Sequence, residues 1–104
     1  MTHPVRFISA ARAELERAQD WYEAQRPGLG TQFVERVDEA VAKIAKHPEA
    51  YQQIINDVRR AAIPRFPYAL WFRIEPDFSI VIACLHKRRE TTRAIKHALK
   101  RLDP

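Results

Sequence analysis

Residues 58–89 read VRRAAIPRFPYALWFRIEPDFSIVIACLHKRR, and this stretch decides the fold of the C-terminal half. Apolar and polar side chains alternate within it, which predicts three short strands at 58–63, 69–75 and 79–85. Proline-containing segments separate the three and predict tight turns. Because the sequence SIVIACL at 79–85 is apolar on both faces, we expect this strand at the centre of the sheet.

The residues before this stretch follow a helical period instead. A first strand is expected at 4–8, then helices at 10–24 and 31–46, in which apolar residues recur on one helical face. The sequence RPGLG at 26–30 separates the two helices, so they are predicted to form an antiparallel hairpin. His47-Pro48 ends the second helix, because the residue before a proline is pushed out of the helical conformation.

Three further segments complete the predicted fold. Ser9 is expected to cap the first helix, residues 49–57 to form a polar connection, and residues 90–102 to form a basic helix. The element order is then β-α-α-β-β-β-α. The predicted fold class is α+β, with a helical hairpin packed on a small, mainly antiparallel sheet of three to four strands. Residues 1–104 are expected to form a single domain.

The two halves of the chain differ in charge. Residues 1–57 carry seven Lys and Arg against nine Asp and Glu, a net charge of −2. Residues 58–104 carry eleven against four, a net charge of +7. The C-terminal half therefore predicts a surface that meets an anionic partner.

Several function classes are disfavoured by what the sequence lacks. The lone Cys84 rules out an internal disulfide and, inside an apolar run, is expected to be a buried thiol. No stretch approaches the ~20 apolar residues of a membrane span, and the first residues lack a signal-peptide pattern. A cytoplasmic protein with no membrane partner is expected. Scattered histidines and the lack of a glycine-rich phosphate loop predict neither a metal site nor a cofactor.

Arginines are the main candidates for a functional site. The guanidinium group binds phosphate or carboxylate through two parallel hydrogen bonds and never loses its charge. Because the strands meander, these arginines are predicted to converge on one face of the sheet. The alternative is that each covers apolar surface or pairs with a carboxylate of the helices. The six candidates are Arg59, Arg60, Arg65, Arg73, Arg88 and Arg89.

Two more candidates lie near these arginines. His86 ends the last strand directly before three cations, which would favour the neutral imidazole and allow it to act as a general base. Alternatively, it is a strand-end histidine held by a hydrogen bond. Tyr68 follows Pro67 and is expected either to stack on a base or assist acid chemistry, or to lie at the edge of the core.

These residues, in their order along the chain, resemble the ParE/RelE toxin superfamily. In the helical half the resemblance rests on Trp21-Tyr22-Glu23, on RPGLG at 26–30, and on His47-Pro48 with Tyr51. In the basic half it rests on Arg59-Arg60, RFPY at 65–68, FRI at 72–74, and Leu85-His86 before Arg88-Arg89. The resemblance covers nearly the whole chain. It implies the toxin of a bacterial type II toxin–antitoxin pair.

The superfamily divides in function. RelE-like members cut mRNA in the ribosomal A site and often use a tyrosine near the C-terminus, whereas ParE-like members block DNA gyrase without being nucleases. This chain has no tyrosine after Tyr68, and its hairpin turn, RFPY loop and LHKRR segment resemble ParE-like chains more closely. We therefore expect a non-enzymatic gyrase inhibitor that blocks replication. The alternatives are a ribosome-dependent mRNA endonuclease with His86 as base, and an inactive relative that only binds its antitoxin.

All three functions imply a cognate antitoxin and a hetero-oligomer with it. The antitoxin is expected to lay an extended or helical segment along the hairpin and the sheet edge, with its acidic residues meeting arginines. The expected contacts are Trp21, Tyr22, Phe33, Arg60 and Arg73. Each of the three aromatic residues could instead belong to the core.

Overall fold

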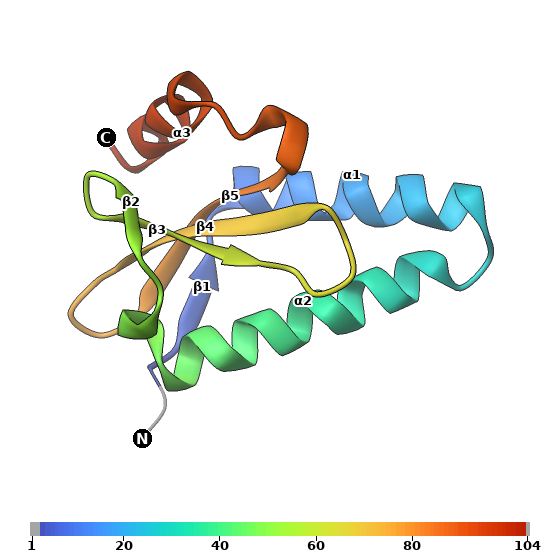
Figure 1. Cartoon of the computed structure of the whole chain (residues 1–104), viewed down its shortest axis with the longest axis horizontal. Coiled ribbons are helices and arrows are strands. Elements are labelled where there is room, and N and C mark those ends of the chain that lie inside the picture. Colours follow the sequence, from blue (N-terminus) through green and yellow to red (C-terminus); the bar gives the residue numbers. More distant parts are fainter. Residues whose placement is uncertain (1–2, 104) are drawn as a thin grey trace.

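The computed structural model describes residues 3–103 and confirms an α+β fold. A five-stranded sheet is covered by two helices on one face and by a third helix on the other (Figure 1). The strands are β1 (Val5–Phe7), β2 (Gln53–Ile55), β3 (Val58–Ala62), β4 (Tyr68–Ile74) and β5 (Ser79–His86). The α-helices are α1 (Ser9–Gln25), α2 (Leu29–Lys46) and α3 (Thr92–Leu99). Short 3-10 helices are η1 (Pro48–Ala50), η2 (Lys87–Arg89) and η3 (Lys100–Leu102).

The sheet has the order β1-β5-β4-β3-β2, and only the β1–β5 pair is parallel. The prediction of three to four strands was too low, because β2 lies in the segment expected to be a polar connection. An edge strand of three residues with exposed side chains carries almost no apolar signal. The turn after β2 does have a signal in the sequence, because Asn56-Asp57 stands between apolar residues. In the structure, Asn56 adopts the left-handed φ of 54° that such turns use.

β5 is an interior strand, although the central position belongs to β4. The sequence of β5 is apolar on both faces because an apolar cluster covers each face of the sheet, and a bulge shifts its alternation. Trp71 pairs with Ala83 and Phe72 with Val81, so Ile82 is an extra residue. Ile82 and Ala83 consequently both belong to the core on the α3 side of the sheet.

The hairpin of α1 and α2 is held by its turn. Gly28 has a φ of +90°, which favours glycine, and a Cβ on Gly30 would lie 2.7 Å from the carbonyl oxygen of Gln19. The Glu23 carboxylate accepts hydrogen bonds from the backbone N–H groups of Gly28 (2.9 Å) and Gly30 (3.0 Å), which caps α2. The expected cap at the other helix was wrong by one residue: Ile8 is the N-cap of α1 and Ser9 is its first helical residue.

Two apolar clusters lie on opposite faces of the sheet. The larger joins the hairpin to the sheet through residues such as Phe33, Leu70 and Phe72. The smaller includes Trp71 and the buried α3 residue Ile95. Each face of the sheet is therefore covered by apolar contacts, and the polar groups that matter for function lie at the strand ends.

The described residues contain no helix that is both long and apolar enough to cross a membrane. Over residues 3–103 there is also no group of three or more His, Cys, Asp or Glu side chains placed to hold a metal ion. Cys84 is a buried free thiol, as expected from its surroundings. Burial, with a smaller effect of Glu14, raises its pKa to about 12, so it stays protonated and unreactive.

Candidate functional site

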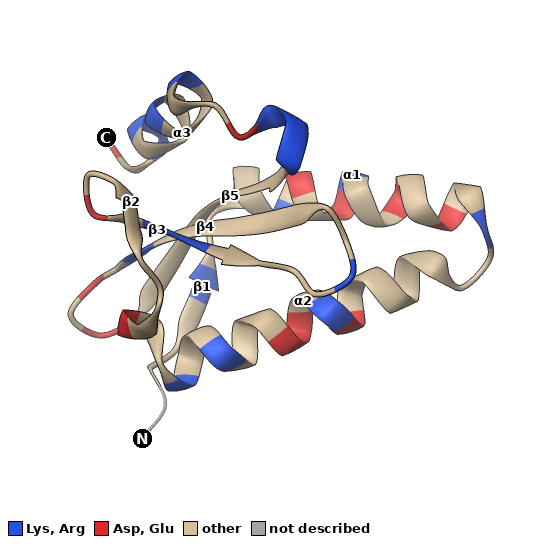
Figure 2. Cartoon of the chain, viewed as in Figure 1, with Lys and Arg blue, Asp and Glu red and all other residues tan. Residues whose placement is uncertain are grey.

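The six candidate arginines do not share one face of the sheet, contrary to the prediction. Figure 2 shows basic residues in β3, in the β3–β4 loop and in the segment that follows β5. Residues directly opposite each other on paired strands point to the same side. Arg60 is opposite Trp71, so it lies on the α3 side, and Arg59 alternates to the hairpin side. Arg73 shares the α3 side with Val58, its partner on β3. The remaining three lie outside the sheet, Arg65 in the β3–β4 loop and Arg88 and Arg89 in η2.

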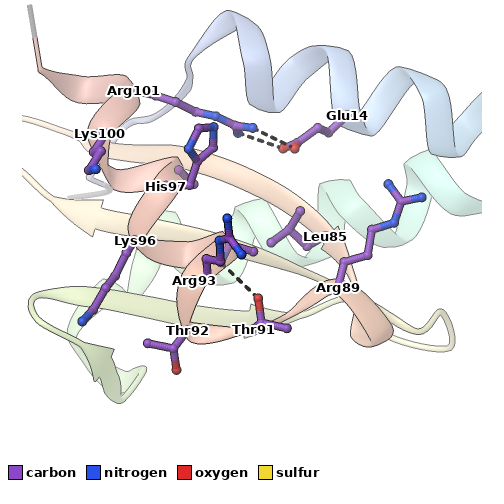
Figure 3. A pocket seen from close by; sticks show the side chains of 12 residues that line it. Glu14, Leu85, Arg89, Thr91, Thr92, Arg93, Lys96, His97, Lys100 and Arg101 are labelled. Atoms are coloured by element: carbon purple, nitrogen blue, oxygen red, sulfur yellow. Dashed lines mark hydrogen bonds and ion pairs between the residues drawn. The ribbon is translucent and has the colours of Figure 1, made fainter.

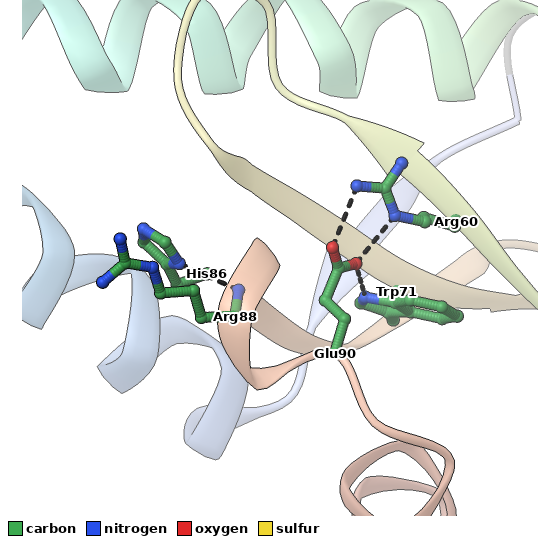
Figure 4. Close-up of polar contacts among 5 residues, drawn as sticks. All are labelled: Arg60, Trp71, His86, Arg88 and Glu90. Carbon is green, nitrogen blue, oxygen red and sulfur yellow. Dashed lines mark hydrogen bonds and ion pairs between the residues drawn. The ribbon is translucent and has the colours of Figure 1, made fainter.

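Arg60 is held by a carboxylate from the end of the chain (Figure 4). Its Nε and Nη2 donate to the two oxygens of Glu90 at 2.7 and 2.9 Å. The indole Nε1 of Trp71 donates to the same carboxylate at 2.7 Å. The Glu90 side chain is only 8% exposed, and its hydrogen bond raises the pKa of Arg60. Arg60 therefore has its carboxylate partner within the protein.

Arg73 and Arg59 are also engaged. Arg73 donates to Glu75 at 2.8 and 2.9 Å, and Asp57 lies 3.9 Å from its Nε. Arg59 donates to the backbone carbonyl oxygens of Tyr51 and Glu49 and so fixes the connection before β2. Both arginines therefore serve the fold, but their partners are turn carboxylates and backbone carbonyl oxygens and not the helix carboxylates of the predicted alternative.

Three of the six arginines remain exposed and have no ion pair among the described residues: Arg65, Arg88 and Arg89. Arg65 has a φ of 68°, a left-handed conformation that is unusual for an arginine. Its exposed position offers no packing that would reward this conformation. Backbone strain of this kind is found at functional positions, so it keeps Arg65 a candidate.

His86 and Tyr68 lie next to each other between α1 and η2. Their ring centres are 5.1 Å apart in an edge-to-face arrangement. His86 Nδ1 accepts a hydrogen bond from the backbone N–H of Arg88 at 3.0 Å (Figure 4). In a neutral imidazole with Nδ1 as acceptor, the proton is on Nε2, so in this geometry the ring presents a donor and no free acceptor. Burial raises the pKa of Tyr68, whose ring packs against Tyr22 and Phe33.

Three open hollows surround η2. One of about 690 Å³ lies on the α1 side, with Trp21, Tyr68, His86 and Arg88 among its lining residues. A second of about 590 Å³ contains the Arg60–Glu90 pair, Trp71 and Lys87. A third of about 930 Å³ lies along α3 (Figure 3). The 3-10 helix that ends β5 is therefore the point on which the candidate surfaces converge.

Of the three aromatic residues expected to contact an antitoxin, only Trp21 is at the surface, with 58% of its area exposed. Tyr22 and Phe33 belong to the core, at 9% and 0% exposure, so their expected role as surface contacts is corrected. Their ring centres are 5.2 Å apart, and both pack on Phe66. Trp21 rests edge-on against Tyr22 at 5.1 Å and extends this cluster to the surface.

A second ion pair, between Glu14 and Arg101, was not anticipated from the sequence. Arg101 donates to the two carboxylate oxygens of Glu14 at 3.2 and 3.1 Å and to the carbonyl oxygen of Ile82 at 2.8 Å (Figure 3). Glu14 also accepts the backbone N–H of Cys84 at 3.0 Å. Because β1 pairs with β5 only as far as Val81, these two side chains satisfy the edge of β5 beyond that point.

The fold is that of ParE- and RelE-like toxins, as comparisons with known proteins show. The sequence profile of the ParE toxin of type II toxin–antitoxin system parDE matches residues 5–91, and the chain belongs to this family. In solved structures, a chain of the chromosomal ParDE toxin–antitoxin system from P. aeruginosa superimposes with a TM-score of 0.72 at 17% identity. That alignment covers 80% of this chain and 94% of the other. No curated protein matches in a sequence comparison.

A more distant structural relative comes from the RelBE2 toxin–antitoxin complex of Mycobacterium tuberculosis. It has a TM-score of 0.58 and 20% identity, over 83% of this chain and 92% of that one. At these identities the two structures establish a shared fold.

Proposed function

We propose that this protein is the toxin of a type II toxin–antitoxin module, that it inhibits DNA gyrase and blocks replication, and that it does so without cleaving nucleic acid. Membership of the ParE family supports the toxin role. The observation that carries the non-enzymatic part is the pairing of Arg60 with the buried Glu90 carboxylate. The target, gyrase, is inferred from the ParE-like character of the chain.

The Arg60–Glu90 pair disfavours phosphoryl chemistry in that hollow. A ribonuclease needs cations that stabilise charge developing on a phosphate in the transition state. Here a carboxylate already accepts the paired hydrogen bonds from Nε and Nη2 of Arg60, and it also accepts the one from Trp71. A phosphate that enters the hollow would be repelled by the Glu90 carboxylate, whose side chain is 8% exposed, and would have to displace it from Arg60.

His86, the candidate general base of a ribonuclease, is also poorly placed to take a proton from a ribose hydroxyl. His86 uses Nδ1 to accept the Arg88 N–H, and a neutral ring in this state holds its proton on Nε2. The late tyrosine used by RelE-like enzymes has no counterpart, since the last tyrosine of the sequence is Tyr68. Together these features favour binding over catalysis.

Target contact is assigned to the exposed cations at the tip of the sheet: Arg65, Arg88 and Arg89, with His86 and Tyr68 beside them. These side chains are not held by carboxylates among the described residues, so their hydrogen bonds are available to a partner. Arginine is among the residues that contribute most to protein interfaces.

Neutralisation is assigned to a cognate antitoxin that forms a hetero-oligomer with the toxin, as in the RelBE2 toxin–antitoxin complex of the related structure. The hollow beside Trp21 suits it, since this exposed indole next to buried aromatics offers an apolar anchor. Acidic residues of the antitoxin would meet Arg88 and Arg89 in the same hollow.

The test is a supercoiling assay with purified toxin and gyrase, run beside an assay of mRNA cleavage on translating ribosomes. We expect inhibited supercoiling and intact mRNA. Induction in cells should stop growth and trigger a DNA-damage response, and co-expression of the neighbouring antitoxin gene should restore growth. Cleaved mRNA with unaffected supercoiling would establish the endonuclease instead, and growth unaffected by the toxin alone would mark an inactive relative.

A further inference from the structure

The outer side of α3 carries a concentration of free positive charge, of which the proposed gyrase contact uses only Arg89. Between residues 87 and 101 the chain has seven Lys and Arg and one acidic residue, Glu90. That acid is committed to Arg60, and Arg101 is committed to Glu14. We call the four remaining cations that line the hollow along α3 the α3 basic face: Arg89, Arg93, Lys96 and Lys100 (Figure 3).

The α3 basic face is exposed and held in place. All four side chains are exposed, and none has an ion pair within residues 3–103. The opposite side of the helix packs on the sheet through Ile95 (1% exposed) and Ala98 (2%). The Arg101–Glu14 pair fastens the end of the helix to α1. The charges therefore stand on a fixed support.

We propose that the α3 basic face binds the phosphate backbone of duplex DNA without sequence preference. Its biological use rests on the proposed function: it would hold the toxin on the DNA beside the gyrase that works there. From Arg93 to Lys100 a helix rises about 10 Å. Over that length one strand of a duplex presents about three phosphates. The spacing of the cations thus suits a run of phosphates along one strand.

Single-stranded nucleic acid fits this surface poorly. Its binding relies on aromatic side chains that stack on the bases. The sequence contains no Phe, Tyr or Trp after Phe78, so the α3 basic face has no stacking platform of its own. A duplex needs none, because its phosphates alone supply sequence-independent affinity.

An acidic peptide is also a weaker match than DNA. Peptide grooves gain affinity from buried apolar anchors, and the apolar residues of α3 are already packed against the sheet. Isolated ion pairs at an exposed surface contribute at most about 1 kcal/mol each. A polyanion adds the release of its condensed counterions, which favours DNA over a peptide of equal charge at low salt.

The experiment measures fluorescence anisotropy of a labelled duplex of arbitrary sequence, about 20 bp long, with the full-length toxin alone. Four phosphate contacts predict that log K falls against log[salt] with a slope of about −3.6. The variant Arg93→Gln/Lys96→Gln/Lys100→Gln should lower affinity at least about tenfold at low salt and reduce the slope to about −1. The matched control is Lys43→Gln/Lys46→Gln, exposed lysines of α2 on the far side of the hairpin from α3. It should bind like wild type.

Circular dichroism melts verify that both variants are folded. Equal binding by the triple variant and wild type would overturn the proposal, as would tighter binding to a single strand than to the duplex. So would a triple variant that loses antitoxin affinity while keeping DNA affinity, because the surface would then serve the antitoxin. Duplex binding without inhibited supercoiling would support this inference and refute the gyrase target. The reverse result would refute this inference alone.

Discussion

Two groups of cations in the C-terminal half differ in what surrounds them. Arg60, Arg73 and Arg101 each have a carboxylate oxygen at 2.7, 2.8 and 3.1 Å, supplied by Glu90, Glu75 and Glu14. The cations of η2 and α3, and Lys100 of η3, have no ion pair in the described part of the chain. Both groups carry the same charge, yet the first stabilises the fold and only the second can meet a partner. The count of eleven Lys and Arg in this half thus overstates the positive surface available to a partner, since carboxylates of the fold already pair with three of them.

The largest loss of stability is expected when Glu90, the acid that pairs with Arg60 of the first group, is removed. Glu90→Ala leaves both Arg60 and the Trp71 indole without their partner, and breaking such a partly buried pair costs about 3 kcal/mol. This cost is at the low end of the range for breaking buried ion pairs, because the Arg60 side chain is one-third exposed and can be hydrated. Thermal unfolding should begin about 12 °C lower. Glu16→Ala, an exposed acid of α1, is the control, and equal melting temperatures for the two variants would contradict the structural role of the pair.

A smaller loss is expected for Arg101→Ala, about 2 kcal/mol in the free energy of unfolding measured with urea. The variant removes the bonds to Glu14 and to the Ile82 carbonyl oxygen, while Glu14 keeps the Cys84 N–H. Arg93→Ala is matched to it, being an exposed arginine of the same segment without an ion pair among the described residues. If both variants lose the same stability, the distinction between the two groups fails.

Alkaline pH should destabilise the protein by about 2 kcal/mol at pH 10, relative to neutral pH, through Cys84. The pKa of this thiol is about 12 in the folded protein and roughly 8.5 in an unfolded chain. Above pH 9 the unfolded state therefore binds fewer protons, so stability falls as the pH rises. Burial also raises the pKa of Tyr22, Tyr51 and Tyr68, which adds loss in the same direction. Urea unfolding of Cys84→Ala should depend less on pH between 8 and 10.5. If Cys84→Ala and wild type showed the same pH dependence of stability, the Cys84 thiol would not be kept from water in the folded protein.

The smallest effect on stability is expected at Arg65. Arg65→Gly relieves the left-handed backbone, so its melting temperature should equal or exceed that of the wild type. Growth inhibition should nevertheless weaken, because the variant removes an exposed cation assigned to the target. Arg65→Lys, which keeps the charge, separates the two causes. A melting temperature well below wild type for Arg65→Gly would show that the side chain supports the fold instead.

The fold could be predicted because its signals are local. Helical spacing, the RPGLG turn and the alternation in β4 each lie within one element. β2 was not predicted because a strand of three residues at a sheet edge, two of them exposed, buries too little apolar surface to leave a pattern in the sequence. The carboxylate partners of the arginines were not predicted for another reason: they are distant in sequence. Glu90 is 30 residues from Arg60, and Glu14 is 87 residues from Arg101. Such pairs follow from the packing of distant elements, which the spacing of charges along the chain does not encode.

The most direct test of the account compares two variants in the gyrase supercoiling assay. Arg88→Ala/Arg89→Ala removes exposed cations, whereas Arg60→Met removes a paired one and keeps the length of the side chain. The account predicts that half-inhibition requires at least about tenfold more of the Arg88→Ala/Arg89→Ala variant than of wild type, because it lacks two interface arginines. Folded Arg60→Met should inhibit like wild type. Full inhibition by Arg88→Ala/Arg89→Ala together with none by folded Arg60→Met would contradict it.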